Sequence, residues 1–333
     1  MPPSTPPLSR RDALYAALAT GAVAALPDMT RAEPKADARR SSPKRYEMKK
    51  SINLWAFPYP ARMTLRECLR LAKDAGFDAV ELNYDLDNDL SPKSGPKEFR
   101  AIRQAAADIG IAVSGLCSFL FWPYSLTSNK AAERERGLEL AGKMLEAAAE
   151  LGTTNLLVVP GAVGIPWIKG HDPVPLAECD KRAREAVGKL VPRAEKLGVH
   201  LNIENIFFNG YLLSPGDMIA FVDGFGSKHV RAHFDTGNIM LFQRPQDWIA
   251  ALGSRIGNVH LKEFDGNGTD HSLASFRPLL DGTTDWPAVM AAFDRVGYKG
   301  YLTFEYFHPF AHYPEALVHQ TSDALDRILG KKR

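Results

Sequence analysis

The chain has 333 residues, of which 45% are hydrophobic and 24% are charged, a composition typical of a folded globular protein. Its 41 Lys and Arg residues nearly balance its 39 Asp and Glu residues, and the first 49 residues hold nine of the basic and five of the acidic side chains. The remaining 32 basic and 34 acidic residues carry a net charge of −2, which disfavours a nucleic-acid partner because phosphate backbones require a concentrated basic surface.

The N-terminal segment has the pattern of an export signal. Ser9, Arg10 and Arg11 precede an Ala- and Leu-rich stretch over residues 13–26, which is shorter than the roughly 20 apolar residues of a transmembrane helix. Because this pattern resembles a twin-arginine signal, we predict that residues 1–32 direct export to the periplasm or the medium. No stable membrane anchor is then expected after processing. The alternative is a cytoplasmic protein whose tail contains an Arg pair by chance.

A polar segment follows the predicted signal. Residues 33–49 are rich in proline and charge and almost free of large apolar side chains. Such a segment cannot bury enough surface to offset the entropy of ordering, so it is predicted to be a disordered linker. The folded domain is then expected over residues 50–333.

The rest of the chain alternates short β-rich segments with longer segments of helical periodicity. Eight β-rich segments are present, and they begin at Ser51, Ala79, Ile111, Asn155, His200, Val230, Asn258 and Tyr301. Helical segments lie between them over residues 65–75, 133–151, 179–197, 286–296 and 314–329. Several of these end at a glycine, which is typical of a helix C-terminus.

Strict repetition of strand and helix predicts parallel strands. Eight such units predict an α/β fold of the (β/α)8 TIM-barrel type in a single domain. An open, doubly wound sheet is the alternative, but no G-x-G-x-x-G follows the first predicted strand.

Each of the last four predicted strands ends in a potential metal ligand. These ligands are Glu204, Asp235, His260 and Glu305. The carboxyl ends of barrel strands meet at one mouth, and side-chain alternation turns all four residues inward if their apolar neighbours face the helices. One imidazole with three carboxylates suits Mn²⁺, Mg²⁺ or Co²⁺ better than structural zinc. A helix N-cap is the alternative for any single acid, but four such residues on consecutive strands favour a metal site.

The chain from Ser51 to Leu329 resembles the xylose-isomerase-like TIM-barrel family of sugar phosphate isomerases and epimerases. The resemblance is carried by DAGFDAVEL around Glu81, AAELGTTNLLVVPG, AEKLGVHLNIEN, FDTGN, NVHLKE and DGTTDWPAVMAAFDRVGYKGYLTFEY. It implies one divalent cation on the four ligands named above, with Mn²⁺ preferred and Mg²⁺, Co²⁺ or Zn²⁺ as alternatives. It also implies a small-molecule carbohydrate substrate and a homo-oligomer.

A cation at this position predicts proton-transfer chemistry. A divalent ion that contacts the carbonyl oxygen and the adjacent hydroxyl of a keto sugar stabilises the enediolate formed when the α-proton leaves. Glu204 and Glu305 are then predicted to act as base and acid. The expected activity is isomerisation or epimerisation of a keto sugar or sugar derivative, and the sequence leaves the choice between them open.

Lys262 introduces an alternative reaction. The epimerases of the family carry a histidine where this chain has Asn238, and an arginine some residues beyond the strand-seven histidine. Here Lys262 follows His260 in an H-L-K-E sequence and is a candidate proton donor to a leaving hydroxyl. A lyase or dehydratase acting on a keto sugar or keto-glycoside is therefore the runner-up. The other explanation of Lys262 is an ion pair at the rim with Glu263 or Asp265.

Substrate-binding candidates lie on other strands and loops. Glu81, at the end of the second strand, is predicted to bind a sugar hydroxyl, with a structural role at the barrel floor as the alternative. Asn238 is a further candidate. Aromatic residues near the first and third strands can stack on a sugar ring or belong to the core, namely Trp55, Phe57, Phe119 and Trp122.

The remaining histidines do not point to a different functional class. His171 and His308 are loop histidines with no predicted role beyond solvated side chains. A nuclease of the endonuclease IV type needs several zinc ions and more inward histidines than His233 and His260, so it is the third and least favoured class.

Overall fold

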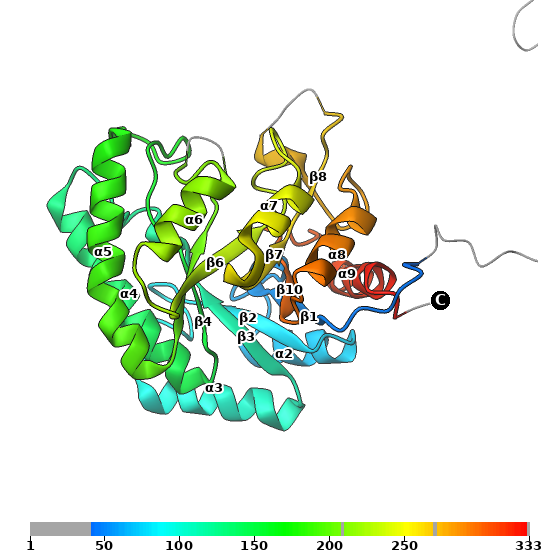
Figure 1. The fold of residues 1–333 in the computed structure, drawn as a ribbon. Coiled ribbons are helices and arrows are strands. Elements are labelled where there is room, and N and C mark those ends of the chain that lie inside the picture. The colour runs from blue at the N-terminus through cyan, green and yellow to red at the C-terminus, as the bar shows by residue number, and fades with distance from the viewer. Residues whose placement is uncertain (1–40, 208–209, 269–271, 332–333) are drawn as a thin grey trace, which may run out of the picture. The chain divides into compact units, whose positions relative to one another are not determined.

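A closed barrel of eight parallel strands forms the centre of the computed structural model, which describes residues 41–207, 210–268 and 272–331 (Figure 1). Each strand pairs with its neighbours along the chain, and the last barrel strand pairs with the first. The barrel strands are β1 (Lys49–Asn53), β2 (Ala79–Asn83), β3 (Ala112–Cys117), β4 (Asn155–Val158), β5 (His200–Glu204), β6 (Val230–Asp235), β7 (Ile256–Leu261) and β10 (Tyr301–Phe304). The predicted TIM barrel is confirmed, and each predicted β-rich segment overlaps a barrel strand.

Helices surround this barrel and pack side by side. They are α2 (Leu65–Asp74), α3 (Pro96–Ile109), α4 (Ala131–Leu151), α5 (Leu176–Leu197), α6 (Pro215–Asp223), α7 (Pro245–Leu252), α8 (Trp286–Arg295) and α9 (Glu315–Ile328). Contacts between α2 and α9 join the first and last of them. The five predicted helical segments agree with α2, α4, α5, α8 and α9 to within three residues. Gly152 and Gly198 end α4 and α5 in the left-handed conformation, as the sequence predicts.

The loop after β7 contains additional structure. A two-stranded antiparallel sheet forms there from β8 (Glu263–Phe264) and β9 (Phe276–Arg277). The buried Glu263 carboxylate accepts hydrogen bonds from the Trp286 indole, the Leu280 backbone and Thr284. This carboxylate therefore ties the loop to the start of α8 and fixes the chain beside the barrel mouth.

Side chains alternate along β5 as expected for a barrel strand. Leu201 and Ile203 are fully buried in the hydrophobic core. On the other face, Asn202 donates a hydrogen bond to the side chain of Asn155 on β4, and Glu204 follows two residues later. Glu204 is therefore held at the mouth by the strand itself.

The folded part begins earlier than the sequence predicts. Residues 41–48 belong to the predicted disordered linker, but Tyr46 and Met48 are buried and the Tyr46 N–H donates to the Leu329 carbonyl after α9. The predicted signal and the remainder of the predicted linker lie outside the described residues. Among the described residues, no helix combines the length and apolar character needed to cross a bilayer.

Candidate active site

The four predicted metal ligands meet at the barrel mouth. Glu204 and Asp235 are the last residues of β5 and β6, His260 lies on β7, and Glu305 follows β10 directly. One ligand atom from each side chain lies within 4.8 Å of the other three. His260 Nδ1 is 3.4 Å from Glu305 Oε2, 3.6 Å from Glu204 Oε1 and 3.9 Å from Asp235 Oδ2. The predicted convergence is therefore present in the structure, and all four residues are buried.

The orientation of His260 depends on a residue from the opposite side of the barrel. Its Nε2 lies 2.6 Å from Glu81 Oε2, and the same carboxylate oxygen accepts a hydrogen bond from Asn53 Nδ2. Because Nε2 is directed to Glu81, Nδ1 is the nitrogen that faces the three carboxylates, and it would offer its lone pair to a bound cation. Glu81 is fully buried and does not line the cavity, so its predicted contact with a sugar hydroxyl is corrected to a contact that orients His260.

Backbone donors hold Asp235 in one orientation. The N–H groups of Gly237 and Asn238 both donate to Asp235 Oδ1 at 2.8 Å. The Asn205 side chain bonds both the N–H and the carbonyl of Asp235. These contacts leave Asp235 Oδ2 directed toward the cluster, and they explain the FDTGN motif as a turn that fixes a candidate metal ligand.

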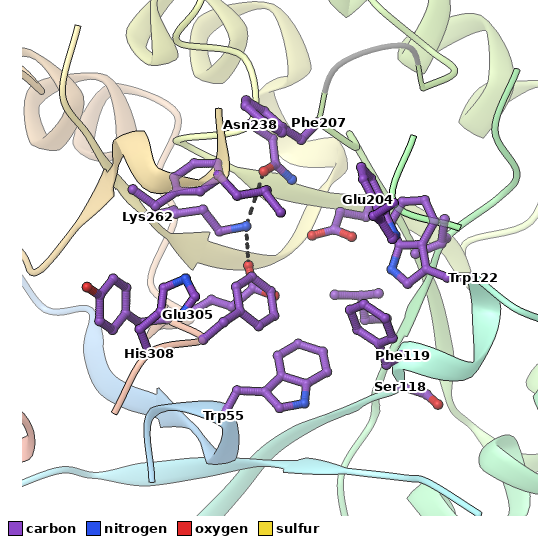
Figure 2. A pocket seen from close by; sticks show the side chains of 17 residues that line it. Trp55, Ser118, Phe119, Trp122, Glu204, Phe207, Asn238, Lys262, Glu305 and His308 are labelled. Atoms are coloured by element: carbon purple, nitrogen blue, oxygen red, sulfur yellow. Dashed lines mark hydrogen bonds and ion pairs between the residues drawn. The ribbon is translucent and has the colours of Figure 1, made fainter. Parts of the chain in front are cut away.

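Lys262 belongs to the cluster. Its ammonium group lies 3.1 Å from Asp235 Oδ2. The same group pairs with Glu305 and donates a hydrogen bond to Asn238 Oδ1 (Figure 2). Lys262 is 4% exposed, so the alternative of a solvated ion pair with Glu263 is wrong. Asp265, the other suggested partner, pairs with Arg277 instead.

Burial and neighbouring charges separate the two glutamates electrostatically. Burial, together with the nearby Glu305 carboxylate, raises the pKa of Glu204 to about 7. Burial also opposes ionisation of Glu305, but the Lys262 ammonium and His260 outweigh it and hold the pKa of Glu305 well below its usual range. Burial disfavours the charged form of Lys262 as well, yet Asp235 and Glu305 raise its pKa above the ordinary value.

The donor atoms fit a divalent cation. His260 Nδ1 makes no hydrogen bond among the described residues, and Asp235 Oδ2 and Glu305 Oε2 share the Lys262 ammonium group as their ion-pair partner. The site also holds four buried carboxylates, Glu81 included, beside only two groups that can carry positive charge, Lys262 and His260. One imidazole nitrogen and three carboxylate oxygens form a set that Mn²⁺, Mg²⁺ or Co²⁺ accepts.

A cavity of about 290 Å³ opens beside this cluster. Glu204, Glu305, Lys262 and Asn238 form its polar part (Figure 2). Its aromatic lining is formed by Trp55, Phe119, Trp122, Trp167, Phe207, Phe276, Tyr306 and Phe307.

The structure separates the predicted aromatic and histidine candidates. Trp55, Trp122 and Phe119 line the cavity as predicted, and His308 lines it as well. Phe57 is instead 2% exposed and belongs to the hydrophobic core, and His171 is not among the lining residues.

The sequence interpretation missed several lining residues. They are Trp167, Phe207, Phe276, Tyr306 and Phe307. Tyr306 and Phe307 directly follow Glu305, so their position just past a strand was an available signal. Trp167 and Phe207 lie on loops and Phe276 on the two-residue strand β9, where no periodicity indicates side-chain direction.

Known proteins match almost the whole described fold. The family model of the xylose isomerase-like TIM barrel matches residues 69–327. An L-ribulose 3-epimerase from Mesorhizobium japonicum is 26% identical over 279 residues, which cover 82% of this chain and 81% of the epimerase.

Solved structures show the same fold. The crystal structure of a D-psicose 3-epimerase in the presence of D-fructose matches with a TM-score of 0.69 and 22% identity, and the match covers 85% of this chain and 100% of the epimerase. A 3-keto-D-glucoside 4-epimerase from E. coli matches with a TM-score of 0.67 and 19% identity over 84% of this chain and 98% of that chain.

Proposed function

Because the chain belongs to the xylose isomerase-like TIM-barrel family, we propose that it is a divalent-metal-dependent epimerase or isomerase of a keto sugar or sugar derivative. The observation that carries the proposal is the convergence of three carboxylates and one imidazole beside a cavity. The relatives named above include ketose and keto-glucoside epimerases, which supports proton transfer over elimination.

Glu204, Asp235, His260 and Glu305 would hold the cation, with His260 contributing Nδ1. When bound, a divalent cation supplies Lewis-acid stabilisation of the negative charge that develops on the carbonyl oxygen and its neighbouring hydroxyl. Glu81 keeps the proton of His260 on Nε2. We propose Mn²⁺ as the physiological ion, on the strength of the oxygen-rich donor set.

Two glutamates are placed to move the proton. Glu204 and Glu305 are cluster members that also line the cavity, so a bound sugar can contact both. One carboxylate removes the α-proton and the other carboxyl group returns a proton. Return to the opposite face of the same carbon gives the epimer, whereas return to the adjacent carbon gives the isomer.

Lys262 is proposed to stabilise the negative charge that appears on substrate oxygens during the reaction. It reaches the cavity wall beside Glu305, and Asn238 holds its ammonium group in place. The same ammonium group could protonate a leaving hydroxyl, which is the basis of the lyase alternative. Loss of a substituent from the sugar is the result that would identify that reaction.

Proton exchange with solvent tests the proposal. Protein loaded with Mn²⁺ is incubated with D-fructose, D-psicose and methyl 3-keto-D-glucoside in deuterated water, and the products are followed by NMR. Deuterium at an α-carbon with every hydroxyl retained supports the proposal, whereas loss of a substituent or no exchange with any keto sugar contradicts it. Glu204→Gln is expected to reduce exchange by about 10²- to 10⁴-fold. Glu185→Gln, an exposed carboxylate on α5, is the matched control and is expected to retain it.

Export and assembly are separate proposals. The Ser-Arg-Arg segment and the Ala-rich stretch after it support export by the twin-arginine route, which accepts proteins that are already folded. Cell fractionation with sequencing of the mature N-terminus tests this, and retention in the cytoplasm with an intact N-terminus would contradict it. The homo-oligomer implied by the family resemblance stays a prediction, which light scattering can check.

A further inference from the structure

One wall of the active-site cavity is a continuous series of aromatic rings. Trp55 contacts Phe119 at 6.2 Å between ring centroids, Phe119 contacts Trp122 at 6.4 Å, and Trp122 contacts Trp167 at 4.8 Å. Phe119 is 43% exposed although it is a large apolar side chain. This aromatic wall, Trp55–Phe119–Trp122–Trp167, therefore presents ring surface to whatever occupies the cavity.

The aromatic wall offers few hydrogen bonds. Ser118 lies beside it, but its hydroxyl donates to the Tyr84 carbonyl and accepts from the Leu120 N–H. Figure 2 shows Lys262, Asn238 and His308 on one side of the cavity and Phe119 and Trp122 on the other. The Trp167 indole N–H is a buried donor without a partner among the described residues, but the four rings of the wall offer no acceptor. A sugar hydroxyl pointed directly at the rings would therefore replace only part of its bonding to water, whereas the C–H face of a sugar ring would not need to.

The cavity is also poorly suited to bind a phosphate group of the substrate. Among the described lining residues, Lys262 is the only one with an ammonium or guanidinium group. That ammonium group is already paired with Asp235 and Glu305, and a phosphate beside it would approach buried carboxylates.

We propose that the substrate is a keto-glycoside whose aglycone contains a ring, either aryl or a second sugar, and that this ring stacks on the aromatic wall. The reacting keto sugar then lies against the carboxylate cluster, and the glycosidic bond crosses the cavity between the two ends. A flat ring, or the C–H face of a sugar ring, is the group that gains most from indole surfaces without needing hydrogen bonds. The keto group of this substrate rests on the proposed function, whereas the ring of its aglycone is inferred from the aromatic wall.

Binding of non-reacting glycosides tests the aglycone independently of catalysis. Calorimetry with the Mn²⁺-loaded full chain compares phenyl β-D-glucopyranoside, methyl β-D-glucopyranoside, methyl β-cellobioside and D-fructose 6-phosphate. The phenyl glucoside is expected to bind about tenfold more tightly than the methyl glucoside. A gain with the cellobioside instead would assign the wall to a second sugar ring and would also support the inference.

Variants locate the binding ring. Trp122→Leu and, separately, Trp167→Leu are expected to remove most of the difference between the phenyl and methyl glucosides. Phe242→Leu removes an 81% exposed ring that does not line the cavity, so it should leave the difference unchanged. Unfolding midpoints of all three variants show whether the fold is retained, and the wild-type comparison stands even if a tryptophan variant fails to fold.

The possible failures are distinguishable. Equal affinity for all three glucosides, no binding of either ring-bearing glycoside, or tighter binding of D-fructose 6-phosphate would overturn the inference and leave the proposed epimerase or isomerase intact. Ring-dependent binding without deuterium exchange on any keto sugar would instead remove the proposed function and keep the aglycone site.

Discussion

The two halves of the barrel contribute different chemistry to the same mouth. Strands β5, β6, β7 and β10 supply the charged cluster, whereas the segments after β1, β3 and β4 supply the aromatic wall. The charged residues lie on the strands or one residue beyond them, and the rings lie on short helical turns and loops. Residues whose atoms must be fixed within a few ångströms of one another therefore lie on or next to strands. Residues that contact a ring can lie on loops, because stacking requires less exact positions.

The largest expected effect is the loss of metal affinity when one carboxylate of the charged cluster is neutralised. Asp235→Asn keeps Oδ1 as the acceptor for Gly237 and Asn238 but removes the negative charge from the cluster. We expect more than about a 100-fold loss of Mn²⁺ affinity. Metal analysis after dialysis measures it, with Asp74→Asn at an exposed position on α2 as the control. Full metal content in the cluster variant would show that the four residues are not a metal site.

Glu81 is an exception to this division of the barrel. It lies on β2, but its carboxylate contacts His260 of the charged cluster on β5, β6, β7 and β10. Glu81→Gln is expected to weaken metal binding by about 10- to 100-fold, since a neutral amide supports the His260 Nε2 proton less well. Calorimetric titration with Mn²⁺ measures the loss, while binding of the phenyl glucoside in the aromatic half should change little. Unaltered metal affinity would restrict Glu81 to packing.

A variant of Glu263 tests whether metal binding by the charged cluster depends on the structure of the loop after β7. Glu263→Gln replaces an acceptor of the Trp286, Leu280 and Thr284 bonds, so the free energy of unfolding should fall by about 1–3 kcal/mol. Urea unfolding measures the change. Metal affinity should fall much less than in the Asp235 variant, because the ligands are held by the strands. An equally large loss of metal would make the loop part of the site.

The smallest expected effect concerns the end of β5 opposite to Glu204. Burial, and then the positive charges of Arg231, His229 and Lys228, lower the pKa of His200 to about 4, below the value of about 6.5 in an unfolded chain. The unfolded chain therefore binds more protons in this window, and stability that is complete above about pH 6.5 is lost as the pH falls toward 4.

Urea unfolding at about pH 7.5 and about pH 5 checks this dependence. His200→Gln cannot titrate, so its loss of stability on acidification should be smaller than that of the wild type. The side chain is partly exposed to solvent, which keeps the difference small. Parallel losses in both proteins would assign the acid sensitivity to other groups.

The sequence predicts the convergence of the four candidate metal ligands because their positions follow a local rule. Glu204, Asp235, His260 and Glu305 each end a β-rich segment, and parallel strands in a barrel bring such ends together. The role of Glu81 was not predictable in the same way. It depends on a contact across the barrel to His260, 179 positions away, which strand periodicity does not encode.

Composition also misplaces the start of the fold. Tyr46 and Met48 are isolated apolar residues in a polar segment, so their burial becomes evident only with the opposing helix in place. For Lys262 the sequence leaves a catalytic role and a rim ion pair with Glu263 or Asp265 both open, and the structure places its ammonium group beside Asp235. In both cases the deciding partner is distant in sequence.

The contact between residues 41–48 and the end of α9 has a practical consequence. All barrel strands run in one direction, so the segment that leads into β1 reaches the barrel on the face remote from the substrate entrance. A label, surface tether or fusion partner joined ahead of Ser41 would leave the entrance unobstructed. The enzyme can thus be immobilised through a group attached N-terminal to Ser41 while its active-site cavity stays open to the solution.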